Sequence, residues 1–463
     1  MAYPIATKNR LCPPNIACVE FVDYLLSLAR SATLRSKPTS ETNLSGSATC
    51  RAHVIRYPAM PIKIKIAESS REIDDALWLR HEVFVIEDGK FGGQPLRGHR
   101  LVDRFDALRD VYHVVAYEGS TPIAAMRLVK DTGAGMPVDE LFDFSVCRNE
   151  VETKLRVAPD DGSEPVANST TARYGSAGML AIRGGWRRRR DVIRSMFRMA
   201  ATVTRFNDVT HVLVVVNYET AGMYRRLGFT QLSEKYWNEE IGNYIVPLAG
   251  SAEGFMKWAH GQTPDTPLSP FQDSFSRWVY RGGEEVFVEG DQGDHAFIVA
   301  SGEIRISRKS DNGATLTLAH LGRGSLFGEL ALIDDETRSA SATATCDCEL
   351  ITLDRSSFLA QIKSEPGLAL QIFKVFASRI RSTGELATVL AFSEPQQRLE
   401  FAFQLARRRA EMDGTQQCEH VFRGGPAEFA LIAAVNQALA LNFLNDRASE
   451  GKVQFSTRHI SFL

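Results

Sequence analysis

The spacing of apolar residues changes twice along this chain, and these changes limit what the chain can fold into. From Ile62 to Val216, strand-like runs alternate with helix-like runs, a pattern typical of an α/β layer structure. From Trp278 to Leu353, apolar and polar residues alternate between glycine and aspartate turns, which predicts a small antiparallel barrel. From Phe358 to Phe392, apolar residues recur at helical spacing, which predicts a long helix. One core cannot satisfy all three patterns, so the 463 residues predict about three domains.

The same patterns suggest where the domains begin and end. Residues 1–60 mix Pro, Ser, Thr and Asn without periodicity, so we expect a poorly ordered leader there. Residues 61–248 would form the α/β domain. Residues 249–270, which contain three prolines, would form a linker with one short helix around Phe255 to Trp258. The barrel and its long helix would occupy residues 271–392. Residues 393–463 indicate a last domain of helices that ends in a strand pair.

Composition excludes several protein classes. Hydrophobic residues make up 44% and charged residues 24% of the chain, which argues against wholesale disorder and against a fibrous protein. The net charge of −2 gives no overall attraction to nucleic acid. The 7 cysteines are scattered and include no Cys-x-x-Cys pair, so we expect no disulfide framework, no metal site and a reducing, cytoplasmic location. No segment offers about 18 uninterrupted apolar residues, so we expect no membrane span.

The sharpest pattern in the first half directly follows the apolar strand His211 to Val216. It reads Asn217-Tyr-Glu-Thr-Ala-Gly-Met-Tyr224-Arg-Arg-Leu-Gly-Phe229. This segment resembles the helix and Gly-Phe ending of GNAT-fold N-acyltransferases, and the resemblance covers residues 62–248. It implies that a splayed strand end receives the pantetheine arm of an acyl thioester and that Tyr224 protonates the leaving thiolate. The alternative is that Tyr224 only packs a helix onto the sheet.

A strongly basic segment precedes this motif. Between Arg183 and Arg198 there are seven arginines and one acid, which leaves a local charge of +6. Guanidinium groups and free amide groups at a helix start match phosphate geometry, so the segment favours an acyl-CoA or acyl-carrier-protein donor. The alternative is a solvated basic surface, because the segment lacks the later glycines of the usual GNAT loop. The expected donor-binding residues are Arg187, Arg188, Arg189, Arg190 and Asn217.

A second resemblance rests on four earlier motifs. These are Arg80-His-Glu-Val-Phe84, Asp103-Arg-Phe-Asp106, His113 to Ala116 and Met126-Arg127-Leu128. They resemble the front half of autoinducer (acyl-homoserine-lactone) synthases and of the related long-chain N-acyl amino acid synthases. The resemblance implies that the acids and arginines organise an amine substrate, although a buried ion-pair network is an equal alternative. The expected substrate residues are Arg80, Phe84, Asp103, Asp106 and Arg127. Ser176 to Ile182 lacks the Glu-x-Ser-Arg strand of that family, so lactone formation is not expected.

The strongest motif of the chain lies in the barrel region. Phe327-Gly-Glu-Leu-Ala-Leu-Ile333, followed by Arg338-Ser-Ala-Ser341, resembles the phosphate-binding cassette of cyclic nucleotide-binding domains, and the resemblance covers residues 271–392. Backbone amides of the cassette would meet a cyclic phosphate, Arg338 would supply the countercharge, and Glu329 would accept a hydrogen bond from the ribose 2′-hydroxyl. The expected ligand-binding residues are Gly328, Glu329, Leu330, Ala331, Arg338 and Ser339. The family favours cyclic AMP over cyclic GMP, and the alternative is a barrel that keeps this architecture without a ligand.

The last region resembles the helix-turn-helix of Crp/Fnr-type regulators from Glu428 to Val453. Ala434 stands where those regulators have a turn glycine, and their DNA-reading Ser-Arg-Glu is replaced by Asn436-Gln-Ala438. Arginine contacts supply much of the affinity and specificity of such domains, so DNA binding is not expected here, although the asparagines and Gln437 keep it open. We interpret this region as a winged-helix-like scaffold for packing or dimer contacts.

Together these observations predict an α/β GNAT-like domain, an antiparallel, jelly-roll-like barrel that binds a cyclic nucleotide, and a winged-helix-like domain. The predicted function is a cyclic-nucleotide-regulated transfer of an acyl group from a thioester to a small-molecule or protein amine. The protein would be a homodimer through the long helix or a monomer. The alternative is a Crp/Fnr-type transcription regulator whose front domain senses acyl thioesters without catalysis.

Overall fold

The computed structural model describes residues 60–91, 98–156, 171–260, 276–310, 313–412, 420–422, 424–457 and 459–463. All of them belong to one structural unit, Tyr57–Leu463. The leader expected at residues 1–60 lies almost wholly outside the described residues, and so does the linker from residue 261 onward.

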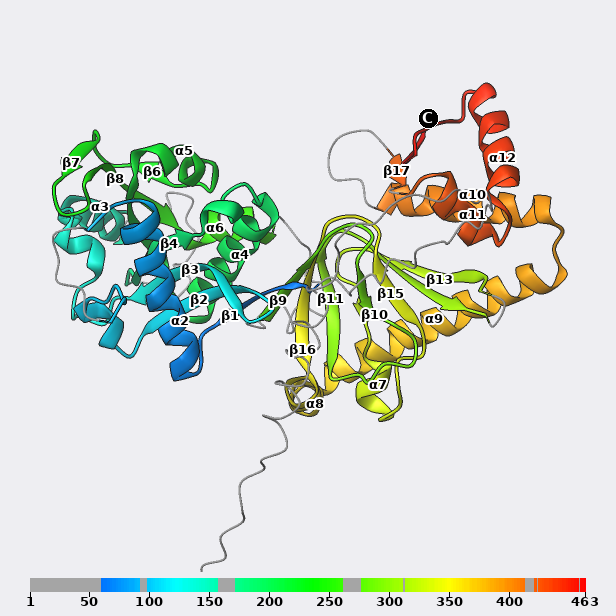
Figure 1. Cartoon of the computed structure of the whole chain (residues 1–463), viewed down its shortest axis with the longest axis horizontal. Coiled ribbons are helices and arrows are strands. Elements are labelled where there is room, and N and C mark those ends of the chain that lie inside the picture. The colour runs from blue at the N-terminus through cyan, green and yellow to red at the C-terminus, as the bar shows by residue number, and fades with distance from the viewer. Residues whose placement is uncertain are drawn as a thin grey trace, which may run out of the picture. The chain divides into compact units, whose positions relative to one another are not determined.

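A mixed sheet forms the centre of the first domain (Figure 1). Its strands in spatial order are β1 (Ile62–Ile66), β2 (Val111–Glu118), β3 (Thr121–Lys130), β4 (Tyr174–Ile182), β5 (His211–Asn217) and β8 (Asn243–Ser251). Two short strands, β6 (Thr230–Gln231) and β7 (Tyr236–Asn238), both pair with β8. Only β4 and β5 run parallel among these strands. The α/β class predicted from the alternating pattern is confirmed.

Helices cover both faces of this sheet because its central strands are apolar on both sides. In β2, Val115 shares a core with Leu79 of α2 (Ser70–Arg80), whereas Val114 faces the other way, toward Met196 of α4 (Arg190–Phe206). Successive strand residues point to opposite faces, so β2 contributes to two cores. The helix α5 (Tyr218–Arg226) lies on the α4 side. The remaining helical segments of this domain are the π-helix η1 (His81–Glu87), the short η2 (Arg104–Ala107), η3 (Pro137–Glu140) and η4 (Gly184–Trp186), and α3 (Ser145–Arg156).

The expected start of the linker needs a correction. Residues 249–260 do not leave the domain: they end β8 and form α6 (Ala252–His260). Phe255 and Ala259 of α6 are buried in the same core as α4. The prolines that suggested a linker begin only at Pro264, outside the described residues.

The parallel strands β4 and β5 separate along their length. They pair at Tyr174–His211, Gly175–Val212 and Ser176–Leu213, and no further pairing joins them although β4 continues to Ile182. The pairing of β4 with β3 is also irregular, and Met179 has a positive φ of 51°. The end of β4 thus has backbone groups on one side that the sheet does not use.

The second domain is an antiparallel barrel of two sheets, as the period-two pattern predicts. One sheet has the order β14-β11-β16-β9 and the other β10-β15-β12-β13. The strands are β9 (Ser276–Tyr280), β10 (Glu285–Phe287), β11 (His295–Ser301), β12 (Ile304–Lys309), β13 (Thr315–Leu321), β14 (Leu326–Phe327), β15 (Ser341–Ala344) and β16 (Cys348–Asp354). Phe297, Ile304 and Leu350 lie in the core between them. The short helix α7 (Leu330–Ile333) follows β14.

The two domains share one continuous sheet. Strand β9 pairs antiparallel with β16 of the barrel and, on its other side, with β1 of the first domain. Val279 of β9 is opposite Ile62 and also opposite Glu349. Each domain thereby covers an edge strand of the other, which would otherwise carry unpaired backbone groups.

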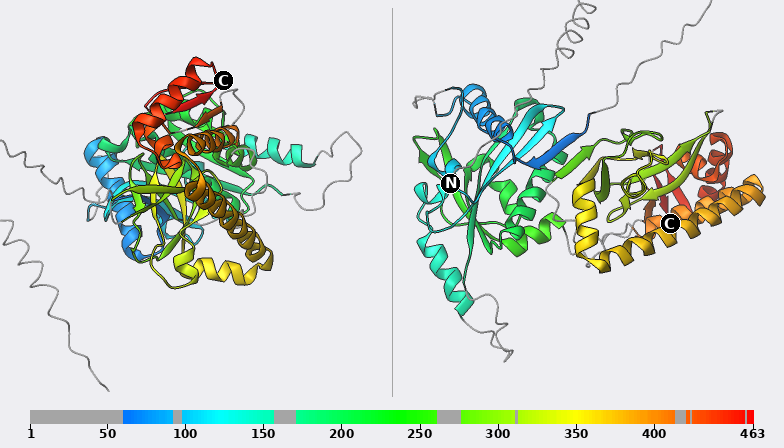
Figure 2. Two further views of the ribbon diagram at one scale, coloured as in Figure 1. Left: turned by 90° about the vertical axis from the view of Figure 1, so that its right-hand side faces the viewer. Right: turned by 90° about the horizontal axis from the view of Figure 1, so that it is seen from below.

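Two helices follow the barrel where one was expected. The chain forms α8 (Arg355–Ser364) and then α9 (Pro366–Phe392), with the break at Glu365. The proline ring of Pro366 lacks an N–H group and suits the first position of a new helix, which explains the interruption. Figure 2 shows α9 as a long, continuous helix.

The last region packs three helices and a small sheet around a core of its own. Its elements are α10 (Pro395–Met412), β17 (His420–Phe422), α11 (Pro426–Ala433), α12 (Gln437–Ser449), β18 (Val453–Phe455) and β19 (Ile460–Phe462). The strand pair predicted at the end of the chain is present, and β17 adds a third strand on the other side of β19.

Candidate functional site

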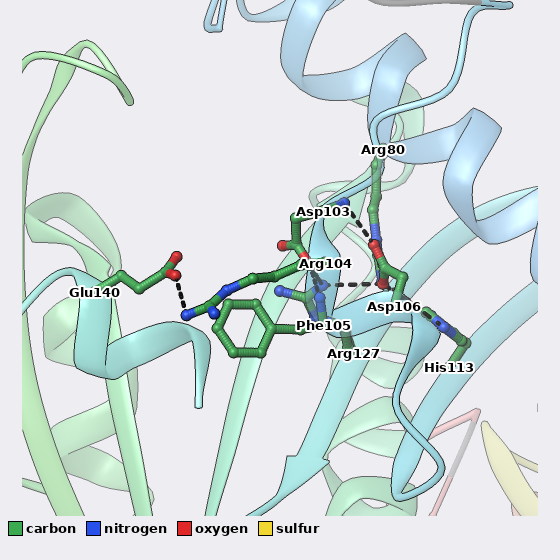
Figure 3. A network of polar contacts seen from close by, with 8 residues as sticks. All are labelled: Arg80, Asp103, Arg104, Phe105, Asp106, His113, Arg127 and Glu140. Atoms are coloured by element: carbon green, nitrogen blue, oxygen red, sulfur yellow. Dashed lines mark hydrogen bonds and ion pairs between the residues drawn. The ribbon is translucent and has the colours of Figure 1, made fainter. Parts of the chain in front are cut away.

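Four of the five expected substrate residues meet in one network of ion pairs (Figure 3). The Arg80 guanidinium, at the end of α2, donates to Asp106 Oδ1 at 2.8 Å and lies 2.9 Å from His113 Nδ1. Arg127 of β3 donates to Asp103 Oδ1 at 2.6 Å and to Asp106 Oδ1 at 2.9 Å. The network therefore ties the short helix η2 to α2, β2 and β3.

This network is internally balanced. Burial acts to raise the pKa of Asp106, but the Arg80 and Arg127 charges outweigh it, so the pKa lies below its usual value. Burial and then the Arg80 charge lower the pKa of His113 to about 4, so the ring is neutral at pH 7. Two aspartates thus face two arginines, and the contacts support the ion-pair alternative that the sequence left open. Phe84 stays outside the network: it lies on η1, 6.1 Å from the ring of Phe91.

The expected donor-binding arginines are not one free cluster. Arg187 donates to Glu87 Oε2 at 3.0 Å and to Asp88 Oδ1 at 2.8 Å, and the Gly184 amide also donates to Glu87 at 2.9 Å. Arg189 pairs with Asp191, with Nε 2.9 Å from Oδ1. Carboxylates of the chain therefore hold two of the four arginines.

Arg188 and Arg190 are exposed at the start of α4, so their side chains can meet an anion from solution. The backbone of this loop is less available, because the amides of Arg187, Arg189 and Arg190 donate to carbonyl groups within the loop. This loop, which lacks the later glycines of the usual GNAT loop, thus forms a tight turn rather than an open ring of amides around a phosphate. Asn217 precedes α5 at the end of β5, and its side chain makes no capping hydrogen bond.

Tyr224 of α5 lies in the core between the sheet and the helices. Its side chain is only 4% exposed, and its ring packs edge-on against Phe197 and Phe229 at centroid distances of 5.5 and 5.7 Å. A cavity of about 20 Å³ beside it is smaller than the volume of a ligand. Burial raises the pKa of the Tyr224 phenol, so it stays protonated at neutral pH. The geometry is compatible with the packing role that the sequence left as an alternative.

The cassette residues surround a much larger cavity. All six expected nucleotide-binding residues line one space of about 600 Å³ between the barrel, α9 and the last region. The structure therefore places all six residues of the predicted nucleotide site around one cavity.

Arg338 enters this cavity from the segment between α7 and β15. The guanidinium donates to the carbonyl oxygens of Gly328 at 2.5 Å and His295 at 2.7 Å and lies over the Phe287 ring at 4.2 Å. Its Nε is buried without a hydrogen-bond partner among the described residues. A Cβ at Gly328, whose φ is +73°, would lie 2.9 Å from Arg338 Nη1, so this close approach requires glycine.

Glu329 is 1% exposed and faces the same cavity. Its Oε1 accepts from Arg379 of α9 at 2.6 Å, whereas its Oε2 has no hydrogen-bond partner among the described residues. Burial raises the pKa of this carboxyl, although Arg379 opposes the change. Buried polar atoms without partners are costly, so a ligand that bonds Oε2 and the Arg338 Nε would relieve both.

The helix α9 also contributes to the cavity, which the cassette motif does not predict. Ser378, Arg379, Ser382 and Thr383 line it beside the cassette. Two pairs of polar residues at i and i+4, Ser378 with Ser382 and Arg379 with Thr383, were the available signal. Only the fold shows that this polar side faces the cassette.

Comparison with known proteins agrees with both halves of this description. The model of the "N-acyl amino acid synthase FeeM" family matches residues 75–251, and that of the cyclic nucleotide-binding domain matches residues 277–365. The cyclic AMP receptor protein of Thermus thermophilus is 35% identical over 198 residues, which cover 42% of this chain and 87% of that protein. The chain belongs to the cyclic AMP receptor protein family. It also carries, ahead of the cyclic nucleotide-binding domain, a FeeM-type domain.

Two further similarities extend this result. The CRP-like cAMP-activated global transcriptional regulator of Mycobacterium tuberculosis is 32% identical over 133 residues, which cover 28% of this chain and 59% of that protein. The solved structure of FeeM, an N-acyl amino acid synthase from uncultured soil microbes, is 14% identical with a TM-score of 0.33. That match covers 43% of this chain and 93% of the FeeM chain.

In the last region, the segment that resembles a helix-turn-helix has other residues at its turn and at the start of α12 than Crp/Fnr-type regulators have. Ala434 takes the left-handed conformation, φ 49°, at the turn where glycine was expected. The Asn436 side chain is used as a cap and accepts from the Leu439 amide at 2.9 Å. Gln437 and Asn442 are exposed on α12.

The described helices also bear on membrane and metal binding. No single described helix is long and apolar enough to cross a membrane, and α11 with α12 passes such a test only as a pair bent by 110°. Phe429 and Ile432 of α11 and Phe443 and Leu444 of α12 lie in the core of the last region. Within the described parts of the chain, no group of three or more His, Cys, Asp or Glu side chains is arranged to hold a metal.

Proposed function

We propose that this protein is an N-acyltransferase whose activity responds to a cyclic nucleotide. The FeeM-type domain would move an acyl group from a thioester to an amine, and the cyclic nucleotide-binding domain would sense the regulator. One observation carries the regulatory part of the proposal: a single hydrogen-bonded sheet runs from one domain into the other through β1 and β9.

The acyl donor would enter where β4 and β5 separate. The unpaired edge of β4 beyond Ser176 offers backbone groups to a pantetheine arm, and the exposed Arg188 and Arg190 offer charge to its phosphate. Both acyl-CoA and acyl carrier protein present this phosphopantetheine chemistry. A cytoplasmic location, which the cysteine pattern favours, gives access to both.

In the transfer itself, the amine nitrogen would attack the thioester carbonyl. The new carbon–nitrogen bond forms as the carbon–sulfur bond breaks, the nitrogen releases one proton to water, and the departing thiolate takes one proton from an acid. Tyr224 is our candidate for that acid, since burial keeps its phenol protonated. Because its side chain is almost fully buried, the role requires that donor binding opens the packing around Phe197 and Phe229. The Arg80–Asp106–Arg127 network would hold the loop that borders the amine rather than bind the amine itself.

The regulatory ligand would be cyclic AMP, with cyclic GMP as the alternative. The phosphate would meet Arg338 and the cassette amides, and the ribose hydroxyl would meet Glu329 Oε2, which has no partner within the described structure. The similarity to a cyclic AMP receptor protein supports cyclic AMP.

A buried charge cluster at the domain junction supports coupling between the two sites. Glu349 of β16 accepts from Arg277 of β9 at 3.0 Å and also pairs with Arg198 of α4. On the side of the first domain, Arg198 follows Phe197, whose ring contacts Tyr224. On the side of the barrel, β16 pairs with β11, and the His295 carbonyl of β11 accepts a hydrogen bond from Arg338. A shift at the cassette would therefore reach the acyl site through directly bonded or packed groups.

A homodimer through α9 is part of the proposal. Leu370, Phe373 and Ile380 are 57%, 63% and 73% exposed. They belong to a stripe of small and apolar residues with the alternating three- and four-residue spacing of a coiled coil. The stripe comprises Leu370, Phe373, Ala377, Ile380, Gly384, Ala387 and Ala391. Sedimentation of wild-type and Ile380→Lys protein tests this contact, since a dimer would dissociate on introduction of paired like charges.

The deciding experiment is an acyl-transfer assay with the purified full-length chain. Acyl-CoA and acyl-carrier-protein donors of several chain lengths are incubated with a mixture of amines, with and without cyclic AMP or cyclic GMP. Thiol release and the mass of the amide product are measured. The proposal expects turnover that changes severalfold with a nucleotide, and Arg338→Met should remove that change. Absence of turnover with every donor, together with tight and salt-dependent DNA binding, would favour the transcription regulator instead.

A further inference from the structure

The wall of the nucleotide cavity is completed by the last region of the chain. Besides the barrel, the cassette and α9, the cavity is lined by three residues of α10 and one of α11. These are Phe401, Leu405, Arg408 and Ile432. The region that resembles a DNA-binding module therefore contributes both apolar surface and a guanidinium to the space where the nucleotide would sit.

A charged contact holds this region against the barrel. Glu428, in the first turn of α11, accepts from Arg305 of β12 at 2.7 Å. Its other oxygen lies 2.9 Å from Nε2 of His320 on β13. The second ring nitrogen of His320 lies 2.6 Å from Glu303. One glutamate of the last region thus joins two neighbouring barrel strands, β12 and β13.

The surroundings of this contact make it specific. The His320 side chain is 1% exposed and its ring lies 5.7 Å from that of Phe422, while Glu428 is 13% exposed. Burial acts to raise the pKa of Glu428, but the bonds from His320 and Arg305 outweigh it and hold the pKa below its usual range. Glu428 is therefore a charged carboxylate at neutral pH, and its counterion Arg305 lies on the barrel.

The contact and the cavity wall involve the same elements. His320 both lies against Glu428 and lines the cavity, and Ile432 lies one helical turn after Glu428 on α11. Separation of Glu428 from the barrel would move the side of α11 that closes the cavity. Retention of this contact would instead keep a bound nucleotide enclosed between the cassette and α10.

We infer that the winged-helix-like region is the lid of the nucleotide site, with Glu428 as its latch and with Phe401 and Leu405 as part of the surface that receives the ligand. The inference rests on the nucleotide binding proposed above. It assigns to this region a role in ligand binding, in place of DNA reading, for which the start of α12 has Asn436-Gln-Ala438 instead of Ser-Arg-Glu. A bound cyclic nucleotide then leaves only after Glu428 releases Arg305 and His320.

The test measures how fast a nucleotide leaves the full-length protein. A fluorescent cyclic AMP analogue is bound and then displaced with excess unlabelled cyclic AMP. The latch variant Glu428→Gln should release the analogue at least tenfold faster than wild type. Glu450→Gln is the matched control, because it removes the same charge from a surface pair of α12 that does not touch the barrel. It should release the analogue at the wild-type rate.

A second variant covers the case in which Glu428→Gln does not fold. Leu405→Ala keeps the latch but removes lid surface from the cavity, and it should also speed release. Wild-type binding with unchanged release in Glu428→Gln and Leu405→Ala would overturn the lid and leave the proposed function intact. Absence of nucleotide binding by the wild-type protein would overturn both.

Discussion

Glu349 provides the sharpest test of the domain junction. Its carboxylate lies between the guanidiniums of Arg277, whose side chain is 0% exposed, and Arg198, whose side chain is 16% exposed. Glu349→Gln keeps the shape of the side chain but removes its charge, so two neighbouring cations would lose the carboxylate that they share. Loss of one partner from a buried ion pair costs about 3–5 kcal/mol. Because Arg198 can regain some water, we expect the lower end, about 3 kcal/mol.

The pH dependence of this loss follows from the pKa of Glu349. Burial acts to raise that pKa, but the charges of Arg277 and Arg198 outweigh it and place it below the usual value of 4.5. A carboxyl whose pKa is lowered by folding stabilises the folded state above its unfolded pKa and stops doing so as the pH falls through the folded pKa. The difference between wild type and Glu349→Gln should therefore be constant from pH 5 upward and shrink below about pH 4.5.

Urea denaturation and differential scanning calorimetry measure this difference. A loss of about 3 kcal/mol corresponds to a fall of roughly 6–12 °C in the Tm of the first transition. The control Asp74→Asn removes an exposed partner of Arg100 and should leave the Tm unchanged. Arg277→Met added to Glu349→Gln should recover part of the loss, because the fully buried cation is then gone. A Glu349→Gln protein as stable as wild type at pH 7 would refute the reasoning.

Three other changes test separate features of the chain. Arg338→Met removes a buried charge that faces the cassette and should weaken cyclic AMP binding about 10- to 100-fold by calorimetry, while equal affinity would contradict its role. Ala434→Gly relieves the left-handed conformation at φ 49° and should raise the stability of the last region by about 0.5–1 kcal/mol in urea; a loss of stability would argue against that conformation. Asp106→Asn leaves Arg80 and Arg127 with less countercharge in a buried network and should cost about 3 kcal/mol, measured by the same denaturation.

The sequence predicted best what local patterns determine. The strand β5, the helix that carries Tyr224 and the cassette from Phe327 to Ser341 all depend on short-range periodicity and turn chemistry. The six cassette residues line one cavity because all of them lie within one short stretch of the chain, from Gly328 to Ser339. The break between α8 and α9 was missed although Pro366 marks it, since the apolar spacing on both sides outweighed one proline.

Long-range pairings could not be predicted in this way. Nothing in Ile62–Ile66 or Ser276–Tyr280 indicates that these two strands pair, because an edge strand is compatible with any other exposed edge. The arginines at Arg187 and Arg189 looked free in the sequence, yet carboxylates neutralise both, one of them from a residue 100 positions away. Charge counted along a segment therefore overestimates the charge that a ligand meets.

The same limit explains why the last region was interpreted as a scaffold. The replacement of Ser-Arg-Glu by Asn436-Gln-Ala438 argues only against DNA binding. The proposed role as a lid depends on Glu428, an ordinary acid at a helix start that sequence patterns do not single out. What makes Glu428 informative is the pair of barrel groups opposite it, Arg305 and His320, which lie more than 100 residues earlier. A largely buried ion pair adds little net stability, but it restricts the ways in which two domains can pack against each other. For that reason the orientation of α10 and α11 over the cavity, rather than the sequence of α12, is the feature of this region that bears on function.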